Sequence, residues 1–108
     1  MGYEALRFSP QGVQLDTEKA FFEFDERCHL QLIGELAAST GEFPLLSRIQ
    51  DPYGDANFHA TEIAKLQSEA LRLARKTAIA TLRTELIRFS ETLNGLVGSN
   101  ANLCFFGD

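Results

Sequence analysis

The chain has 108 residues, of which 44% are hydrophobic, and this length and composition suit one domain with its own core, residues 1–108. Its formal net charge is −5, and residues 1–62 hold eleven acidic and four basic side chains, so this half carries −7 and repels phosphate groups. Charge therefore disfavours nucleic-acid binding, and no apolar run approaches the roughly 20 residues of a membrane span, so we expect no membrane contact.

The sequence also predicts a cytoplasmic protein without disulfides. Residues 1–8 alternate in polarity and lack the long apolar region of a signal peptide. Cys28 and Cys104 lie far apart and match no zinc spacing, so we interpret both as small buried hydrophobes.

The N-terminal quarter predicts short extended segments. Residues 3–8 alternate as a strand, and Ser9-Pro10-Gln11-Gly12 forms a turn that leads to a short second strand at residues 13–15. Residues 19–24 are rich in phenylalanine, which suits another strand or an extended lead into the first helix.

The first helix is predicted over residues 26–39. Asp25 is a suitable N-cap, and an acidic residue in the first turn favours the helix dipole. Leu32 and Leu36 recur at helical spacing, with His29 beside them as a packing residue. Gly41 ends this helix, and Pro44 prevents it from resuming.

The second half of the chain predicts helices with two apolar stripes. Thr61 is the expected N-cap of the helix that follows it, whose apolar stripe is Ile63, Leu66, Ala70 and Leu73. The second stripe steps by three and four in a sustained a/d pattern: Ile79, Leu82, Leu86, Phe89, Leu93 and Leu96. The stripes are out of phase across residues 75–77, which predicts a break there. One long helix remains the alternative, because no glycine or proline separates the two halves.

The C-terminal run Leu103-Cys104-Phe105-Phe106 is suited to a strand in the same sheet as residues 3–8, because a lone strand cannot satisfy its backbone. The predicted fold is therefore α+β: a small sheet formed by the N- and C-terminal strands, packed against two or three helices.

The loop over residues 51–59 is the first place to look for chemistry. Asp51-Pro52-Tyr53-Gly54 suits a type I turn. An EF-hand counted from Asp51 needs an oxygen ligand at Tyr53 and glycine at Ala56, so we expect no metal. The two histidines lack the partners of a nucleophilic site, so we expect neither catalysis nor a cofactor.

A protein-binding surface fits these residues better. Aromatic side chains among charged ones are common where proteins bind tightly, and acidic residues favour a partner with a basic surface. The candidate partner-binding residues are Asp25, Glu26, Glu42, Asp51, Tyr53, Asp55 and Phe58. As an alternative to a role in binding, Arg48 can pair internally with Asp51 or Asp55 and brace the loop. Three alternatives stay open: a merely solvated acidic face, a module that self-associates as a homodimer through the helix at residues 79–96, and a small ligand-binding domain or enzyme that uses the 51–59 loop.

The order of these elements, with Leu45-Leu46-Ser47-Arg48-Ile49 through Asp55 and the closing residues 103–108, resembles a group of small, mostly uncharacterised bacterial proteins. This group includes immunity proteins of toxin systems used in competition between bacteria. The resemblance implies an immunity protein, that is, a cytoplasmic inhibitor that binds one cognate antibacterial toxin and has no catalysis of its own.

Overall fold

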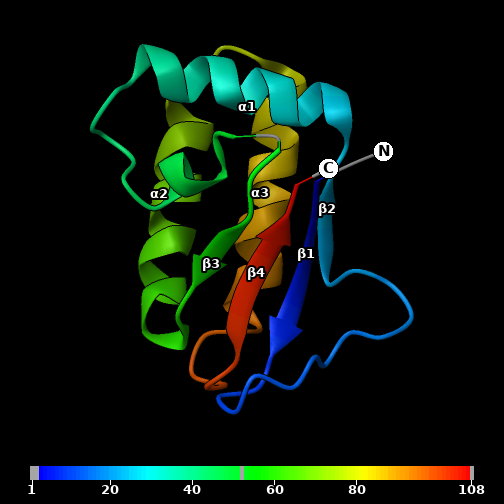
Figure 1. The fold of residues 1–108 in the computed structure, drawn as a ribbon. Helices are drawn as coiled ribbons and strands as arrows, with labels where there is room; N and C mark the ends of the chain where they lie inside the picture. The colour runs from blue at the N-terminus through cyan, green and yellow to red at the C-terminus, as the bar shows by residue number, and fades with distance from the viewer. Residues whose placement is uncertain (1–2, 52, 108) are drawn as a thin grey trace.

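The computed structural model describes residues 3–51 and 53–107, and it confirms the predicted α+β fold. The described residues form four strands and three helices (Figure 1). In chain order they are β1 (Tyr3–Phe8), β2 (Phe22–Phe24), α1 (Glu26–Ala38), β3 (Ala56–Phe58), α2 (Ile63–Lys76), α3 (Ala80–Asn94) and β4 (Asn102–Phe106). Two short 3₁₀ helices, η1 (Leu46–Ile49) and η2 (Ala60–Glu62), flank β3.

The sheet is antiparallel and has the order β2-β1-β4-β3, so the two ends of the chain form its central pair. Leu6 lies opposite Cys104 in this pair, which confirms the predicted pairing of the terminal strands. The strand expected at residues 13–15 is reduced to one bridge, between Phe8 and Gln14. Residues 56–58, expected in a loop, instead form an edge strand that is too short to show a period in the sequence.

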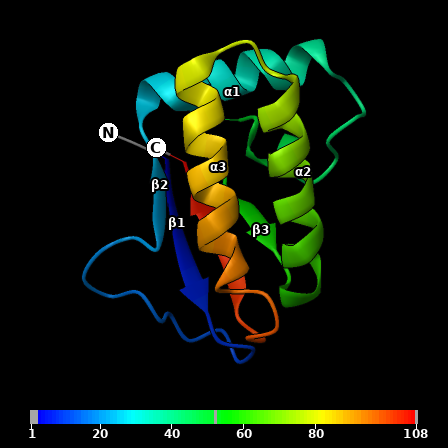
Figure 2. The same cartoon turned by 180° about the vertical axis from the view of Figure 1, so that it is seen from behind.

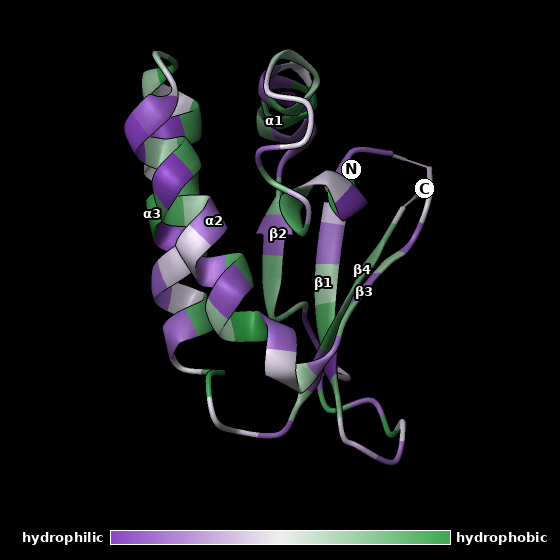
Figure 3. Ribbon diagram, turned by 90° about the vertical axis from the view of Figure 1, so that its left-hand side faces the viewer, coloured by the Kyte–Doolittle hydropathy of each residue, from purple (hydrophilic) through white to green (hydrophobic). Residues whose placement is uncertain are grey.

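The helices all lie on one face of the sheet. Seen along the sheet, α2 and α3 cover one side and α1 crosses above one end, while no described helix lies on the other side (Figure 3). From behind, α2 and α3 run alongside each other across the sheet (Figure 2). The second apolar stripe packs inside this layer, with Leu82, Leu86, Phe89 and Leu93 fully buried.

The predicted break between the two helices is confirmed, and the single long helix is wrong. Helix α2 ends at Lys76, Thr77 is extended, and α3 begins at Ala80. The Arg83 side chain donates to the carbonyl oxygens of Ala74 and Thr77, at 3.2 and 2.8 Å. This arginine therefore satisfies carbonyl groups at the end of α2 that a continuous helix would have bonded internally.

Of the two predicted helix N-caps, one is confirmed and the other is wrong. Asp25 caps α1 as expected, because its Oδ1 accepts from the Cys28 amide at 2.7 Å. The N-cap predicted at Thr61 is wrong, since His59 caps η2 instead and α2 begins two residues after Thr61. The His59 ring accepts from the Thr61 amide and the Glu62 carboxylate accepts from the His59 amide, which is a capping box with histidine in the place of serine.

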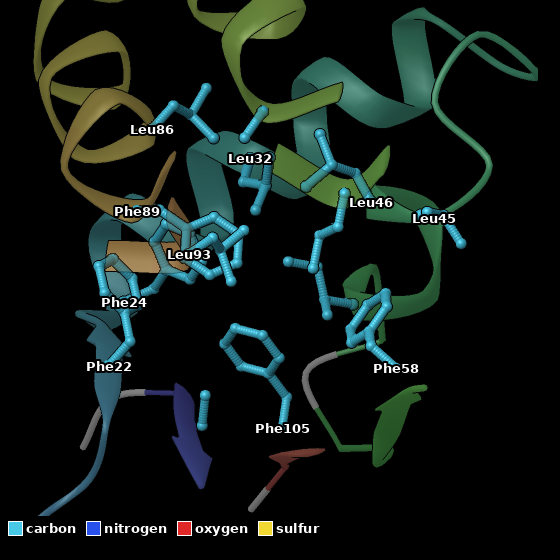
Figure 4. Close-up of a cluster of buried hydrophobic side chains, with 14 of the residues drawn as sticks. Phe22, Phe24, Leu32, Leu45, Leu46, Phe58, Leu86, Phe89, Leu93 and Phe105 are labelled. Atoms are coloured by element: carbon cyan, nitrogen blue, oxygen red, sulfur yellow. The ribbon is translucent and has the colours of Figure 1, made fainter. Parts of the chain in front are cut away.

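Aromatic rings fill the space between the sheet and the helices (Figure 4). The Phe105 ring lies 5.8 Å from that of Phe89 and 6.0 Å from that of Phe24. Phe58 points into the same cluster from β3. Cys28 and Cys104 are both free and buried, as predicted.

A buried carboxylate holds the segment that leads to β3. Glu69 of α2 is 1% exposed, and its Oε1 accepts from the amides of Leu45 and Leu46 at 2.9 and 3.0 Å. Its Oε2 has no hydrogen-bond partner among the described residues. Helix α2 thereby fixes the start of η1 and, through it, the position of the loop before β3.

Candidate functional site on the open face of the sheet

The face of the sheet without helices carries three rows of outward side chains, which follow from strand alternation and register. The first, which we call the acidic row, is Glu23, Glu4, Phe106 and Asp55. The second is Leu6, Cys104 and Asn57, and the third is Phe8 and Asn102 flanked by Gln14 and His59.

The register places the members of the acidic row directly beside one another. Glu4 lies opposite Glu23 on one side and opposite Phe106 on the other. Asp55 precedes Ala56, which pairs with Phe105, so Asp55 lies on the other side of Phe106. Its Oδ1 accepts from the Gly107 amide at 3.2 Å, which fixes it there. One exposed aromatic ring is therefore flanked by a carboxylate on each side.

No salt bridge reaches the carboxylates of this row within residues 3–51 and 53–107, although Lys19 and Arg88 line a shallow depression together with Glu4 and Glu23. Salt bridges join Arg7 to Asp16, Arg48 to Glu62, Lys76 to Glu42 and Arg88 to Glu85, and none reaches Glu4, Glu23 or Asp55. Like charges directly opposite each other in a sheet are destabilising. The register thus places the Glu4 and Glu23 side chains next to each other across β1 and β2.

Below the acidic row the open face is hollowed to a volume of about 430 Å³. We call this depression the sheet hollow. Cys104, 8% exposed, and Asn57 belong to its middle row, and the rings of Phe8 and Phe106 stand 6.1 Å apart between their centres. Its remaining lining comes from Asp55, Phe58, His59, Asn102 and Leu103. Burial, and secondarily Asp55, raises the pKa of the Cys104 thiol, so this thiol stays protonated and serves as an apolar surface.

The loop before β3 is anchored to the core rather than free. The Tyr3 hydroxyl donates to the Gly54 carbonyl at 3.0 Å, and the Tyr3 ring stacks on His29 and Phe105. Burial, followed by the charge of Asp55, raises the pKa of Tyr3 to about 12, so this donor keeps its proton. His29, which is 4% exposed, bonds the Ile49 carbonyl through Nε2 at 2.7 Å, as expected of a packing histidine.

The tip of this loop presents one aromatic side chain. Tyr53 is 80% exposed, and its amide donates to the Asp51 side chain at 2.9 Å. The Gly54 amide bonds the Asp51 carbonyl at 3.3 Å, which fits the predicted turn, although its second residue, Pro52, lies outside the described residues. A Cβ on Gly54 would approach the Asp51 carboxylate to 2.9 Å, so glycine suits this position.

Five of the seven predicted partner-binding residues gather at one end of the sheet. Asp25 and Glu26 follow β2, and the other three belong to the loop before β3: Asp51, Tyr53 and Asp55. Because β2 and β3 are the two edges of a four-stranded sheet, the two groups lie about 14 Å apart at the two ends of the acidic row, which includes Asp55. The start of α1 and this loop lie together at the upper end of the sheet (Figure 1).

The other two residues are not part of this surface. Phe58 is 1% exposed and packs in the core, so its prediction as a partner contact is wrong. Glu42 lies beyond the far end of α1, which is about 20 Å long, and forms a salt bridge with Lys76. Arg48 pairs with Glu62 at 2.6 Å rather than with Asp51 or Asp55, and this pairing lowers the pKa of Glu62 to about 2.

Sequence reasoning missed the acidic row and the sheet hollow. A signal was present, because Glu4, Leu6 and Phe8 alternate with the buried Tyr3 and Ala5. Strand β4 likewise has apolar side chains on both faces. Apolar residues on both sides of a strand are typical of a strand that is buried on both faces, whereas here one of the two sides is uncovered.

Both edge strands are partly occupied along their backbones. The Arg48 guanidinium donates to the Asn57 carbonyl of β3 at 2.9 Å, and Arg88 donates to the Glu23 carbonyl of β2 at 3.1 Å. Each edge strand has only three residues. Short, occupied edges disfavour the addition of a partner strand, so the face of the sheet is the better candidate for binding.

Other kinds of site lack a basis in the described structure. In its two described ranges, no three His, Cys, Asp or Glu side chains are arranged to hold a metal ion. None of the helices described is both long and apolar enough to cross a membrane.

Comparison with protein-family models, curated proteins and solved structures found no match to this chain. The fold and the site define a small α+β domain whose half-covered sheet presents apolar side chains, bordered by acidic ones that form no salt bridge among the residues described.

Proposed function

We propose that this protein is an immunity protein, a cytoplasmic inhibitor that binds one cognate antibacterial toxin through a basic surface of that toxin. The observation that supports this most is the acidic row, in which Glu4, Glu23 and Asp55 have no salt-bridge partner in the described ranges and border an uncovered apolar face. The resemblance of its element order and loop motif to immunity proteins adds the biological setting.

The distribution of charge suits inhibition of a basic partner. The acidic row and the acidic groups at its two ends extend about 14 Å across the sheet, so several carboxylates can face one basic surface. A toxin that acts on nucleic acid needs a basic substrate cleft, and carboxylates can occupy such a cleft in place of phosphates. Complementary charge also raises the association rate, which favours rapid neutralisation of a toxin.

The rigidity of the loop suits tight binding. Tyr3 and His29 fix both sides of the turn that carries Tyr53, so little conformational freedom is left to lose there when a partner binds. Tyr53 then provides an exposed aromatic anchor beside Asp51 and Asp55. Exposed tyrosine among charged groups is a common arrangement at binding hot spots.

A small-molecule ligand is a second candidate, and a specific observation favours it. The volume of the sheet hollow, which is lined in part by Asp55, Asn57 and His59 of the 51–59 segment, falls within the roughly 300–1,000 Å³ of ligand pockets.

The homodimer through residues 79–96 is less well supported, because the apolar stripe of α3 is already buried in the core of a single chain.

Co-purification and co-expression test the proposal. The tagged protein is recovered from the lysate of its own cells, and the product of the neighbouring gene is expressed with and without it. We expect one basic protein in stoichiometric amount, whose toxicity this chain suppresses. If the chain is recovered alone and co-expression restores no growth, the immunity function is rejected.

A matched pair of variants then tests the surface. Glu4→Lys reverses a charge in the acidic row, and Glu91→Lys reverses another exposed charge, on α3, that forms no salt bridge among the described residues. We expect Glu4→Lys to weaken the toxin at least tenfold, or about 1.4 kcal/mol, mainly through slower association at low salt. Equal affinities of the two variants would remove the acidic row from the interface.

A further inference from the structure

We infer that the sheet hollow and the acidic row together bind an extended segment of the partner, in which one large apolar side chain and one arginine are separated by a single residue. This inference rests on the proposed function and specifies the chemistry of the partner at that site.

The sheet hollow supplies the place for the apolar side chain. Cys104 and Asn57 of the middle row form part of its lining, and the rings of Phe8 and Phe106, which pack together with their centres 6.1 Å apart, border it. A volume of about 430 Å³ lies at the lower end of the range of ligand pockets, which suits one bulky side chain together with the adjacent backbone. An apolar anchor in such a pocket is the usual centre of a protein interface.

The acidic row supplies the place for the arginine. Glu4 and Asp55 flank Phe106 on neighbouring strands, so their Cα atoms lie about 10 Å apart with the aromatic ring between them. Phe106 is 38% exposed and offers part of its ring to a cation. A planar guanidinium can stack on that ring while its N–H groups reach either carboxylate, which a lysine ammonium does less well.

The spacing between the two places sets the motif. Side chains on one face of a strand recur every second residue, which is about 6.8 Å along the strand. The middle row of the sheet hollow is one such step from the acidic row. An extended partner segment that lies along the strands therefore matches both places with its residues i and i+2, in either order according to its direction.

Two other occupants fit less well. A second copy of this chain, docked face to face, would bring two acidic rows towards each other and add like-charge repulsion. A strand added at an edge would have to displace Arg48 or Arg88 from the carbonyl groups that they bond.

Peptide selection tests this inference without the toxin. A random seven-residue phage library is panned on the immobilised full chain, and enriched peptides are synthesised and measured by fluorescence anisotropy. We expect enrichment of an aromatic or leucine residue two positions from arginine. No enrichment, or enrichment of apolar peptides without a basic residue, would overturn the inference. The second of these outcomes would favour a small apolar ligand in the sheet hollow.

Two variants and a control locate the binding. Asn57→Trp places a ring in the sheet hollow from an exposed position of β3 and should reduce the affinity of an enriched peptide at least tenfold. Glu4→Gln should reduce it severalfold and make it less sensitive to salt, whereas Glu91→Gln should leave it unchanged. Unchanged affinity of both test variants would refute the site.

Nuclear magnetic resonance keeps the inference testable if Asn57→Trp does not fold. In the wild-type chain, the peptide should shift the side-chain amide signals of Asn57 and Asn102 and the backbone amide of Gly107, and shifts confined to other elements would overturn the inference. Its outcome is separate from that of the proposed function. Enrichment of the motif without protection from a toxin would reject immunity alone, and protection without motif binding would reject this inference alone.

Discussion

Replacement of Glu69 should loosen the segment that positions the binding loop. Its single engaged oxygen accepts from two buried amides, those of Leu45 and Leu46, and these contacts join α2 to residues 43–50. The carboxylate is buried, and its other oxygen has no partner among the residues described, so the charge itself is poorly compensated. The contribution of Glu69 to stability therefore comes mainly from one atom, Oε1, which accepts both hydrogen bonds.

The expected magnitudes follow from that arrangement. Glu69→Ala leaves two buried N–H groups without an acceptor, and a hydrogen bond to a charged group contributes about 1.5–3 kcal/mol. Relief of the buried charge offsets part of the loss, so we expect unfolding to become easier by about 3–4 kcal/mol. Glu69→Gln keeps an oxygen in the place of Oε1 and removes the charge, so we expect a loss of about 1 kcal/mol.

Urea unfolding followed by circular dichroism measures these free energies, with Glu91→Ala, an exposed change on α3, as the control. The order Glu91→Ala, Glu69→Gln, Glu69→Ala in increasing loss would support the acceptor role. Equal losses for the alanine and glutamine variants would refute it, because they would show that the charge matters rather than the oxygen atom.

Three further predictions concern the core and the loop. Burial lowers the pKa of His29 from 6.5, so below that pH the unfolded chain binds a proton that the folded protein binds less well. The free energy of unfolding should therefore fall from about pH 7 to pH 5. Urea unfolding at several pH values should show that this free energy depends less on pH in His29→Gln, and an unchanged pH dependence would contradict this origin. Gly54→Ala should cost about 0.5–1.5 kcal/mol by disturbing the Asp51 bond to the Tyr53 amide, and almost nothing in an Asp51→Ala background, so equal costs in both backgrounds would disprove the close approach. Phe58→Ala should cost about 3–5 kcal/mol in thermal or urea unfolding, and a loss below 1 kcal/mol would be inconsistent with its burial.

Features set by neighbouring residues could be predicted from the sequence. The cap at Asp25 depends on an amide three residues away, and the break at Thr77 follows from two apolar stripes that are out of phase. Pairing of the terminal strands was also predicted, because an isolated C-terminal strand would leave its backbone unsatisfied.

Features set by register could not be predicted. Glu23, Glu4 and Asp55 are far apart in the chain, and they share a row only because the four strands of the sheet align in one register. Phe58 was assigned to the surface because its neighbours are polar, yet three residues of strand are enough to turn it inward. The pairing of Arg48 with Glu62 likewise requires the turn through β3 and η2 that brings them together.

The position of the acidic row within the fold explains how a small domain can carry it. Glu4 and Phe106 lie on the two central strands, whose inner faces hold Ala5 and Phe105 in the core. The repulsion between Glu4 and Glu23 is therefore imposed by the most firmly packed part of the sheet, whereas the loops could relax and separate such charges. If the proposed function holds, this surface keeps its adjacent carboxylates until the partner binds, and that arrangement favours a basic partner over a neutral one.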